Sequence, residues 1–174
     1  MSQSKPDLIA SLFIQALREG QSLWFRVASN SMFPLLRKGD EVYIQPAQAH
    51  EIHLGEIAAF ETSSGLVIHR IISIQHTPTG MRLLQMSDVE RLTSWVKEQA
   101  VVGRVVSIRR EDRQIDLQSS IAKWCGTVTA RIRNRLYLYD KNMPFRIVLR
   151  GVSRIVIQLS YWCIYRFCAS PVRQ

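Results

Sequence analysis

Three residues of this sequence could together break a bond by nucleophilic attack: Ser31, His69 and Asp88. Ser31 lies in a turn-like run at residues 29–34, and His69 lies in an apolar run at residues 66–72. A serine hydroxyl is a poor nucleophile at neutral pH and needs a hydrogen-bonded base to take its proton. Histidine suits that role because its unperturbed pKa is about 6.5. The three residue types in this order predict a serine hydrolase.

Asp88 and the backbone beside Ser31 supply the other groups that such a reaction needs. A carboxylate on the far side of the imidazole fixes its tautomer and stabilises the imidazolium, and we expect Asp88 to do this for His69. The negative charge that develops on the carbonyl oxygen needs preorganised donors, and the backbone N–H of Ser31 is the natural first one. This chemistry implies no cofactor. No two of the four histidines have the i, i+4 spacing that suits a metal on one helix face.

The run Ser-Met-x-Pro at residues 31–34, with Gly-Asp at residues 39–40, resembles signal peptidase I and the LexA-like serine peptidases. The resemblance covers about residues 22–115. In the endoplasmic-reticulum and archaeal branch of the signal peptidases the base is a histidine instead of a lysine, and His69 stands in that place. The resemblance therefore implies the histidine branch of this superfamily.

The same resemblance assigns two further residues. It implies that the hydroxyl of Ser29, two residues before the nucleophile, is the second oxyanion donor. It also aligns residues 86–88 with the family's Lys-Gly-Asp box, of which this chain keeps only Asp88.

Each of these residues also has a purely structural interpretation. Serine and asparagine in turns commonly hydrogen-bond their own backbone, which would explain Ser31. A histidine on a strand is often simply packed, as His69 would be, and Asp88 could cap a turn. Only their joint order and spacing favours catalysis.

The apolar periodicity divides the chain into three parts. Residues 1–20 predict an amphipathic helix, with a capping box at Ser4 and an end at Gly20. Residues 21–116 contain short β-branched and aromatic runs between hairpin-length turns, which predict a small, mainly antiparallel β-domain. The expected strands are residues 23–27, 41–45, 57–61, 66–75, 81–85 and 101–109. Residues 117–174 predict a helical appendage.

The position of His69 in its expected strand decides which way it points. Side chains alternate between the two faces of a strand. His69 should therefore share a face with Val67 and Ile71, while Arg70 points the other way. This leaves the imidazole free to face a cleft.

The net positive charge of the chain lies almost entirely in the appendage. Residues 1–115 carry 13 Lys and Arg against 12 Asp and Glu, whereas residues 116–174 carry 10 against 2. In the expected helix at residues 145–167, Arg146, Arg150 and Arg154 recur at i, i+4 spacing along one stripe. Arginines in the middle of a spanning helix would cost several kcal/mol, so this helix is not expected to cross a membrane.

Three uses of the appendage remain open. It could pack on the β-domain with its arginines in water, it could lie on an anionic membrane surface, or it could bind nucleic acid. Nucleic acid is the least expected partner because no binding module is recognisable. In membrane docking, the side chains expected to enter the acyl boundary are Ile147, Leu149, Ile155, Ile157, Trp162 and Tyr165.

Cysteine usage and the N-terminal residues predict the compartment. The chain has three cysteines, all in the appendage and without the spacing of a zinc site, which favours a reducing environment. The apolar run at residues 8–17 lacks a cleavage site and is too short to span a bilayer. We expect a cytoplasmic protein, either free or peripheral on the inner face of the membrane.

The expected function is that of a serine endopeptidase that cleaves an extended peptide or protein. Two alternatives remain open. One is a catalytically inactive peptide-binding or scaffold protein of the same fold. The other is a LexA-type autoproteolytic regulator, for which the short segment before the β-domain leaves no room for a DNA-binding module. The sequence gives no indication of the oligomeric state.

Overall fold

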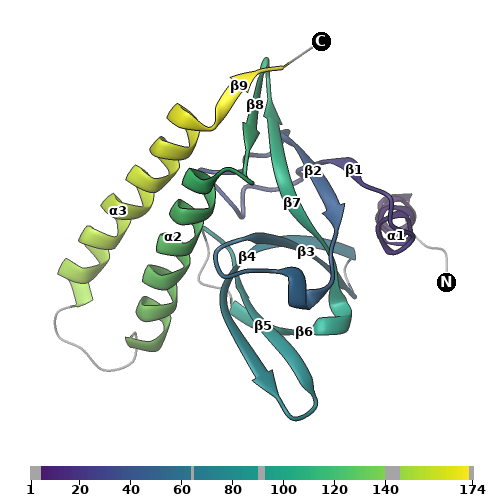
Figure 1. Cartoon of the computed structure of the whole chain (residues 1–174), viewed down its shortest axis with the longest axis horizontal. Helices are drawn as coiled ribbons and strands as arrows, with labels where there is room; N and C mark the ends of the chain where they lie inside the picture. The colour runs from purple at the N-terminus through teal and green to yellow at the C-terminus, as the bar shows by residue number, and fades with distance from the viewer. Residues whose placement is uncertain (1–4, 64, 90–92, 140–145, 173–174) are drawn as a thin grey trace.

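The computed structural model describes residues 5–63, 65–89, 93–139 and 146–172. In this part the chain forms a mainly antiparallel β structure with one helix before the sheet and two after it, as predicted (Figure 1). The strands are β1 (Leu23–Arg26), β2 (Glu41–Pro46), β3 (Ile57–Thr62), β4 (Gly65–Thr77), β5 (Gly80–Met86), β6 (Thr93–Lys97), β7 (Val101–Arg110), β8 (Arg113–Asp116) and β9 (Ala169–Pro171). The helices are α1 (Lys5–Arg18), α2 (Ser120–Tyr139) and α3 (Arg146–Phe167), with 3₁₀ turns η1 (Ala49–Glu51) and η2 (Glu98–Ala100).

The sheet curls into a half-barrel in which neighbouring strands are antiparallel (Figure 1). Across it the strands follow the order β1-β2-β7-β3-β4-β5-β6, and β8 pairs with β7 and β9. All six strands expected from the sequence are present, within one or two residues of their expected ends. The sequence prediction missed β6, β8 and β9, which are only three to five residues long.

Helix α1 ends where the sequence predicts. Gly20 adopts a positive φ of 87°, its N–H bonds to the carbonyl of Leu17, and the next N–H, of Gln21, bonds to the carbonyl of Ala16. This is the hydrogen-bond pattern of a Schellman cap, in which glycine takes the left-handed conformation without strain. The capping box expected at Ser4 lies outside the described residues.

The main hydrophobic core anchors the turn that carries Ser31. Met32, Leu35 and Leu36, which follow Ser31 directly, are at most 2% exposed. They pack in one cluster with the buried face of α1, with strands β2, β3 and β7, and with both C-terminal helices. Ser31 itself is only half-buried. The apolar side chains of the turn thus anchor it to the core.

A β-bulge lies in the β4–β5 hairpin, and it decides which residues can meet. Near the turn, Thr77 pairs with Gly80, but the register shifts by one residue between Ile71 and Ser73. Beyond the bulge, Arg70 pairs with Met86. A shift of one residue moves every side chain beyond it to the other face of the sheet.

The C-terminal helices form an antiparallel pair that packs on the β structure (Figure 1). Helix α2 lies against the turn before β3 so closely that a Cβ added to Gly55 would stand 2.3 Å from the carbonyl carbon of Gly126. Helix α3 buries Tyr161 and Ile164 in the main core, and β9 adds a strand beside β8. Packing is therefore one use of the appendage. None of the helices in the described part of the chain combines the length and hydropathy that a bilayer-spanning segment needs.

The three-part division at residues 20 and 116 coincides with gaps between elements. Helix α1 ends at Arg18 and β1 begins at Leu23, while β8 ends at Asp116 and α2 begins at Ser120. Whether these parts are separate folding units stays a prediction.

Candidate active site

The carboxylate of Asp88 is buried among cations. Arg70 donates to it from Nε at 3.1 Å and from Nη2 at 2.9 Å, and the hydroxyl of Tyr161 donates at 2.6 Å. Nε of Arg133 lies 3.4 Å from the same carboxylate. The side chains of Arg70 and Asp88 are 2% and 0% exposed. Such a fork of two parallel hydrogen bonds is the strong geometry for an arginine and a carboxylate.

The surroundings of Asp88 keep it ionised. Burial alone would raise the pKa of this carboxyl group, but the charge and hydrogen bonds of Arg70, the charge of Arg133 and the hydrogen bond of Tyr161 outweigh burial and lower the pKa below its usual range. Burial and the neighbouring carboxylate raise the pKa of Tyr161, so its hydroxyl keeps its proton and donates it to Asp88. Arg70 also donates to the carbonyl of Gly55 at 2.8 Å.

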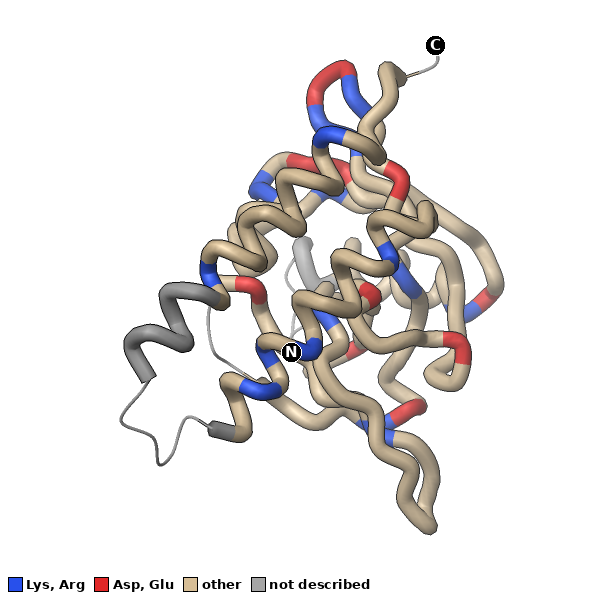
Figure 2. Tube along the Cα trace, turned by 60° about the vertical axis from the view of Figure 1, so that its left-hand side comes forward, with Lys and Arg blue, Asp and Glu red and all other residues tan. Residues whose placement is uncertain are grey.

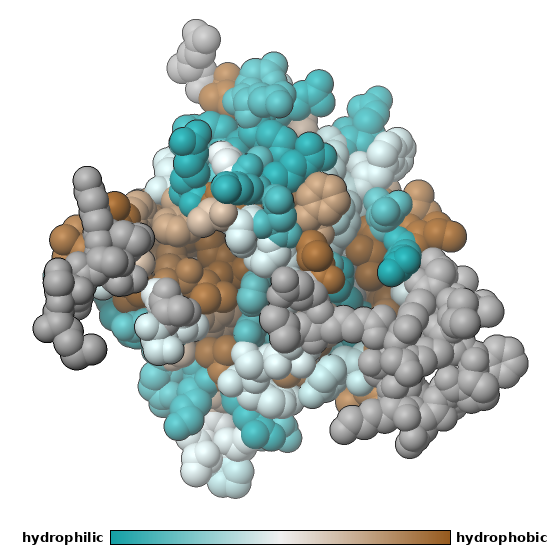
Figure 3. Space-filling view, turned by 180° about the vertical axis from the view of Figure 1, so that it is seen from behind, coloured by the Kyte–Doolittle hydropathy of each residue, from teal (hydrophilic) through white to brown (hydrophobic). Residues whose placement is uncertain are grey.

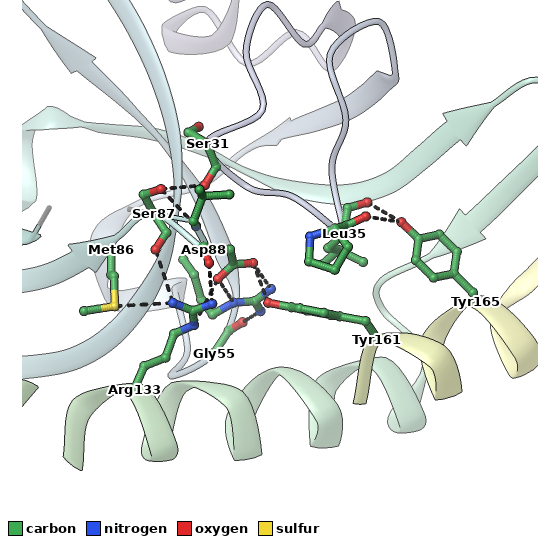
Figure 4. Close-up of polar contacts among 12 residues, drawn as sticks. Ser31, Leu35, Gly55, Met86, Ser87, Asp88, Arg133, Tyr161 and Tyr165 are labelled. Atoms are coloured by element: carbon green, nitrogen blue, oxygen red, sulfur yellow. Dashed lines mark hydrogen bonds and ion pairs between the residues drawn. The ribbon is translucent and has the colours of Figure 1, made fainter. Parts of the chain in front are cut away.

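This cluster holds the main chain of Ser31. The carbonyl oxygen of Ser31 accepts hydrogen bonds from Ser87 Oγ at 2.5 Å and from the N–H of Val89 at 3.1 Å, on either side of Asp88 (Figure 4). Arg133 donates to the carbonyl of Asp88 at 2.5 Å. In Figure 4 the Ser31 side chain is directed away from the cluster. The ion pair therefore fixes the backbone of Ser31 and leaves its hydroxyl outside.

Helix α3 holds the same turn from its other end. The hydroxyl of Tyr165 lies 2.8 Å from the carbonyl oxygen of Pro34 and 2.6 Å from that of Leu35 (Figure 4). Arg110 donates to the same Leu35 carbonyl at 3.0 Å and forms an ion pair with Asp40. The Gly-Asp pair of the sequence pattern closes the loop that carries Ser31, because the N–H of Gly39 bonds to the carbonyl of Val27 and the N–H of Val27 to the carbonyl of Asp40.

The two proposed oxyanion donors lie side by side. Ser29 Oγ donates to Ser31 Oγ at 3.2 Å and accepts from the N–H of Ser31 at 3.4 Å, so both donors are engaged within the turn, and Ser29 is exposed. A hydroxyl and a backbone N–H next to a serine hydroxyl are the donors that a tetrahedral intermediate requires.

His69 lies half-buried on β4, and its ring contacts Gln85 of β5. Nδ1 of His69 is hydrogen-bonded to Oε1 of Gln85, and Gln85 Nε2 donates to Ser94 Oγ at 2.5 Å. Because the amide nitrogen is used by Ser94, its oxygen faces the imidazole and accepts the Nδ1 proton. Nε2 is then the ring nitrogen that would act as the general base.

The prediction that Asp88 orients His69 is wrong for this structure. Arg70 and His69 are adjacent on β4 and point to opposite faces, as expected from the alternation, and Asp88 lies with Arg70. The bulge is the physical reason. If the register near the turn continued along the whole hairpin, Asp88 would lie opposite His69. The shifted register, continued past Met86, instead places Asp88 opposite Ile68, which is on the same face of β4 as Arg70.

In the part of the chain that the structure describes, Ser31 and His69 are each held near the C-terminal end of β5, but Ser31 Oγ is hydrogen-bonded to Ser29 Oγ and not to the imidazole. Ser31 is bound there through its carbonyl to Ser87 and Val89, and His69 through its ring to Gln85. Sequence reasoning missed Gln85 and Ser94. The signal for Gln85 was present, since it is the polar residue of β5 that faces the same side as His69, but its use depends on the bulged register.

Comparison with known proteins adds no assignment. No protein-family model matches the chain, and no curated protein matches it significantly. The roles expected for Ser31, His69 and Ser29 therefore stay predictions, argued from the geometry and chemistry of the described residues.

We predict that Asp88→Asn lowers the free energy of unfolding by about 3–5 kcal/mol, because it leaves the buried guanidinium of Arg70 and the partly buried one of Arg133 without their counter-charge. The matched control is Glu61→Gln, which breaks the exposed pair of Arg18 and Glu61 and should change the free energy by at most about 1 kcal/mol. Urea unfolding followed by tryptophan fluorescence measures both. Equal effects of the two substitutions would contradict the role given to the buried pair.

Low pH should also reduce the stability of the fold through Asp88. The pKa of Asp88 is lower in the folded than in the unfolded chain, so its ionisation stabilises the fold above the ordinary carboxyl pKa of about 3.9 and this stability is lost as the pH falls below it. In urea titrations between neutral pH and pH of about 3, the wild type should lose more stability than Asp88→Asn. A variant that loses as much as the wild type would show that Asp88 does not titrate differently on folding.

Proposed function

We propose that the protein is a serine endopeptidase with Ser31 as nucleophile, His69 as general base and Gln85 as the residue that orients the imidazole. The observation that carries this proposal is the convergence at the end of β5 of a braced serine turn and a histidine whose Nδ1 is occupied. The Ser29 hydroxyl beside Ser31 supports it further.

The reaction would follow the usual course of acyl transfer. Ser31 Oγ attacks the scissile carbonyl carbon while its proton passes to Nε2 of His69, and the oxyanion receives hydrogen bonds from Ser31 N–H and Ser29 Oγ. The imidazolium then returns the proton to the leaving amine as the C–N bond breaks. Water hydrolyses the resulting ester with the same histidine as base. Gln85 is neutral, so it fixes the tautomer but stabilises the imidazolium less than a carboxylate would.

Exposed hydrophobic side chains, one beside Ser31 and others on α1, indicate the kind of substrate. Phe33, two residues after the nucleophile, is 46% exposed, and α1, which packs against β4, exposes Leu8, Ile9 and Leu12. Seen from behind, hydrophobic side chains gather on the side of the molecule where α1 lies (Figure 3). We propose an extended, apolar peptide segment as the substrate.

One observation favours a second function. An amide in place of the acid would weaken catalysis, and this favours a peptide-binding protein of the same fold without activity. The two functions differ in whether the Ser31 hydroxyl reacts.

A fluorophosphonate probe tests the nucleophile. Wild-type protein should be labelled at Ser31, whereas Ser31→Ala and His69→Ala should lose labelling, and Ser29→Ala should slow it by about 10²–10³-fold. Ser170→Ala, an exposed serine of β9, is the matched control and should label like wild type. Intact-mass spectrometry measures the rates. Labelling of Ser31→Ala at the wild-type rate would refute the proposal, and an unreactive wild type would favour the binding function.

Gln85→Glu tests the orienting residue. A carboxylate beside Nδ1 favours the imidazolium and should raise the pKa of His69 by about one unit or more. The acid limb of the labelling rate against pH should move to higher pH by the same amount. The control Gln75→Glu, on β4 near the hairpin turn, should leave this limb in place. An unshifted limb in Gln85→Glu would show that Gln85 does not contact the working imidazole.

A further inference from the structure

The two C-terminal helices have an unusual charge pattern. Helices α2 and α3 together contain eight arginines and lysines and no aspartate or glutamate. Of these, Arg133 is used inside the molecule, where it contacts Asp88. Lys123, Arg131, Arg135, Arg154 and Arg166 are exposed. Figure 2 shows the basic residues along the pair of helices.

The outer face of α3 is apolar as well. Ile155, Leu159 and Trp162 recur at i, i+4 and i+7 and are 61%, 56% and 59% exposed. These spacings place them along one stripe of the helix. The opposite side, with Ile157 and Ile164, is buried in the core. Packing on the sheet therefore explains one apolar side of α3 and leaves the outer one unexplained.

Helix α2 adds to this surface at one end of the pair. Trp124 and Ile121 are 66% and 44% exposed in its first turns. The start of α2 adjoins the end of α3, because Ser119 Oγ lies 3.1 Å from Sγ of Cys168. Phe167, which is exposed and meets the Trp162 ring edge to face at 6.3 Å, lies at this end too.

We infer that the outer faces of α2 and α3, defined here as the helical docking face, bind an anionic lipid bilayer. Its residues are Ile121, Trp124, Ile155, Leu159, Trp162 and Phe167, with the exposed basic residues Arg131, Arg135, Arg154 and Arg166. Lys123 is not included because it lines the pocket between α2 and the turn before β3. The mix of aliphatic, tryptophan and basic side chains without acids matches the surface that interfacial helices present. Each basic side chain near an anionic surface contributes about 1 kcal/mol.

A nucleic acid would use only part of this surface. Phosphates would pair with the arginines, but Ile155 and Leu159 would stay in water. A bilayer would bury these two side chains and also pair with the charges.

The side chains that dock differ from those expected from the sequence. Ile157 is buried and Tyr165 binds the Ser31 turn, so neither can enter lipid. The side chains of Ile147 and Leu149 lie outside the described residues.

Docking on a bilayer would also set the position of the candidate active site relative to the lipid surface. Helix α3 carries Tyr161 and Tyr165, which hold the Ser31 turn through Asp88 and through the carbonyls of Pro34 and Leu35. A bilayer on the outer face of α3 would thus fix the distance of that turn from the lipid surface. The inference itself does not depend on the peptidase proposal.

Sedimentation with lipid vesicles tests the inference on the full chain. Vesicles of phosphatidylcholine with about 30% phosphatidylserine should bind the wild type, and vesicles of phosphatidylcholine alone should bind it much less. The double variant Leu159→Ser/Trp162→Ala should bind the anionic vesicles about tenfold or more weakly, because it removes buried apolar area. Arg154→Gln/Arg166→Gln should lose most of the preference for phosphatidylserine.

The matched control is Leu8→Ser/Leu12→Ser, which removes two equally exposed apolar side chains from α1 and should bind like wild type. Since every substituted residue is exposed, unfolding midpoints should stay unchanged and confirm that the variants fold. The inference would be overturned if the wild type did not bind anionic vesicles, or if Leu159→Ser/Trp162→Ala bound them as well as the wild type does. A short DNA duplex that displaces the protein from vesicles, with affinity unaffected by Leu159→Ser/Trp162→Ala, would assign the face to nucleic acid instead.

Discussion

A single buried carboxylate, that of Asp88, joins the parts of this structure. Removing one partner of a buried ion pair leaves an uncompensated charge, so the groups around Asp88 must all be in place when the chain folds. Arg70 comes from the sheet, and Arg133 and Tyr161 come from the two C-terminal helices. The helical appendage is therefore tied into the sheet by electrostatics as well as by its apolar core.

The same constraint reaches the candidate nucleophile through the backbone. Ser87 and Val89, the neighbours of Asp88, bind the carbonyl of Ser31, and Tyr165 of α3 binds the other end of the turn. In the proposed reaction the charged cluster would therefore position the serine turn and take no part in the chemistry. Catalytic groups must be held to within a fraction of an ångström, and a charged, fully buried support meets that requirement better than a mobile loop.

The sequence predicted those features that depend on local patterns, namely strands β1 to β5 and β7, the end of α1 at Gly20 and the opposite faces of His69 and Arg70. It could not predict the partner of His69. One extra residue in β4 moves Asp88 to the other face, and no local property of the sequence distinguishes the bulged hairpin from a regular one. The short strand β9 was missed because its pairing with β8 depends on where α3 ends.

The account depends most on the Ser31 hydroxyl and the His69 imidazole acting as one unit. A crystal structure of the protein after reaction with a peptidyl phosphonate tests this directly. We expect phosphorus bonded to Ser31 Oγ, Nε2 of His69 within about 2.6–3.2 Å of an adduct oxygen, and Nδ1 still on Gln85. An adduct on another residue, or an imidazole turned away from the adduct, would contradict the account.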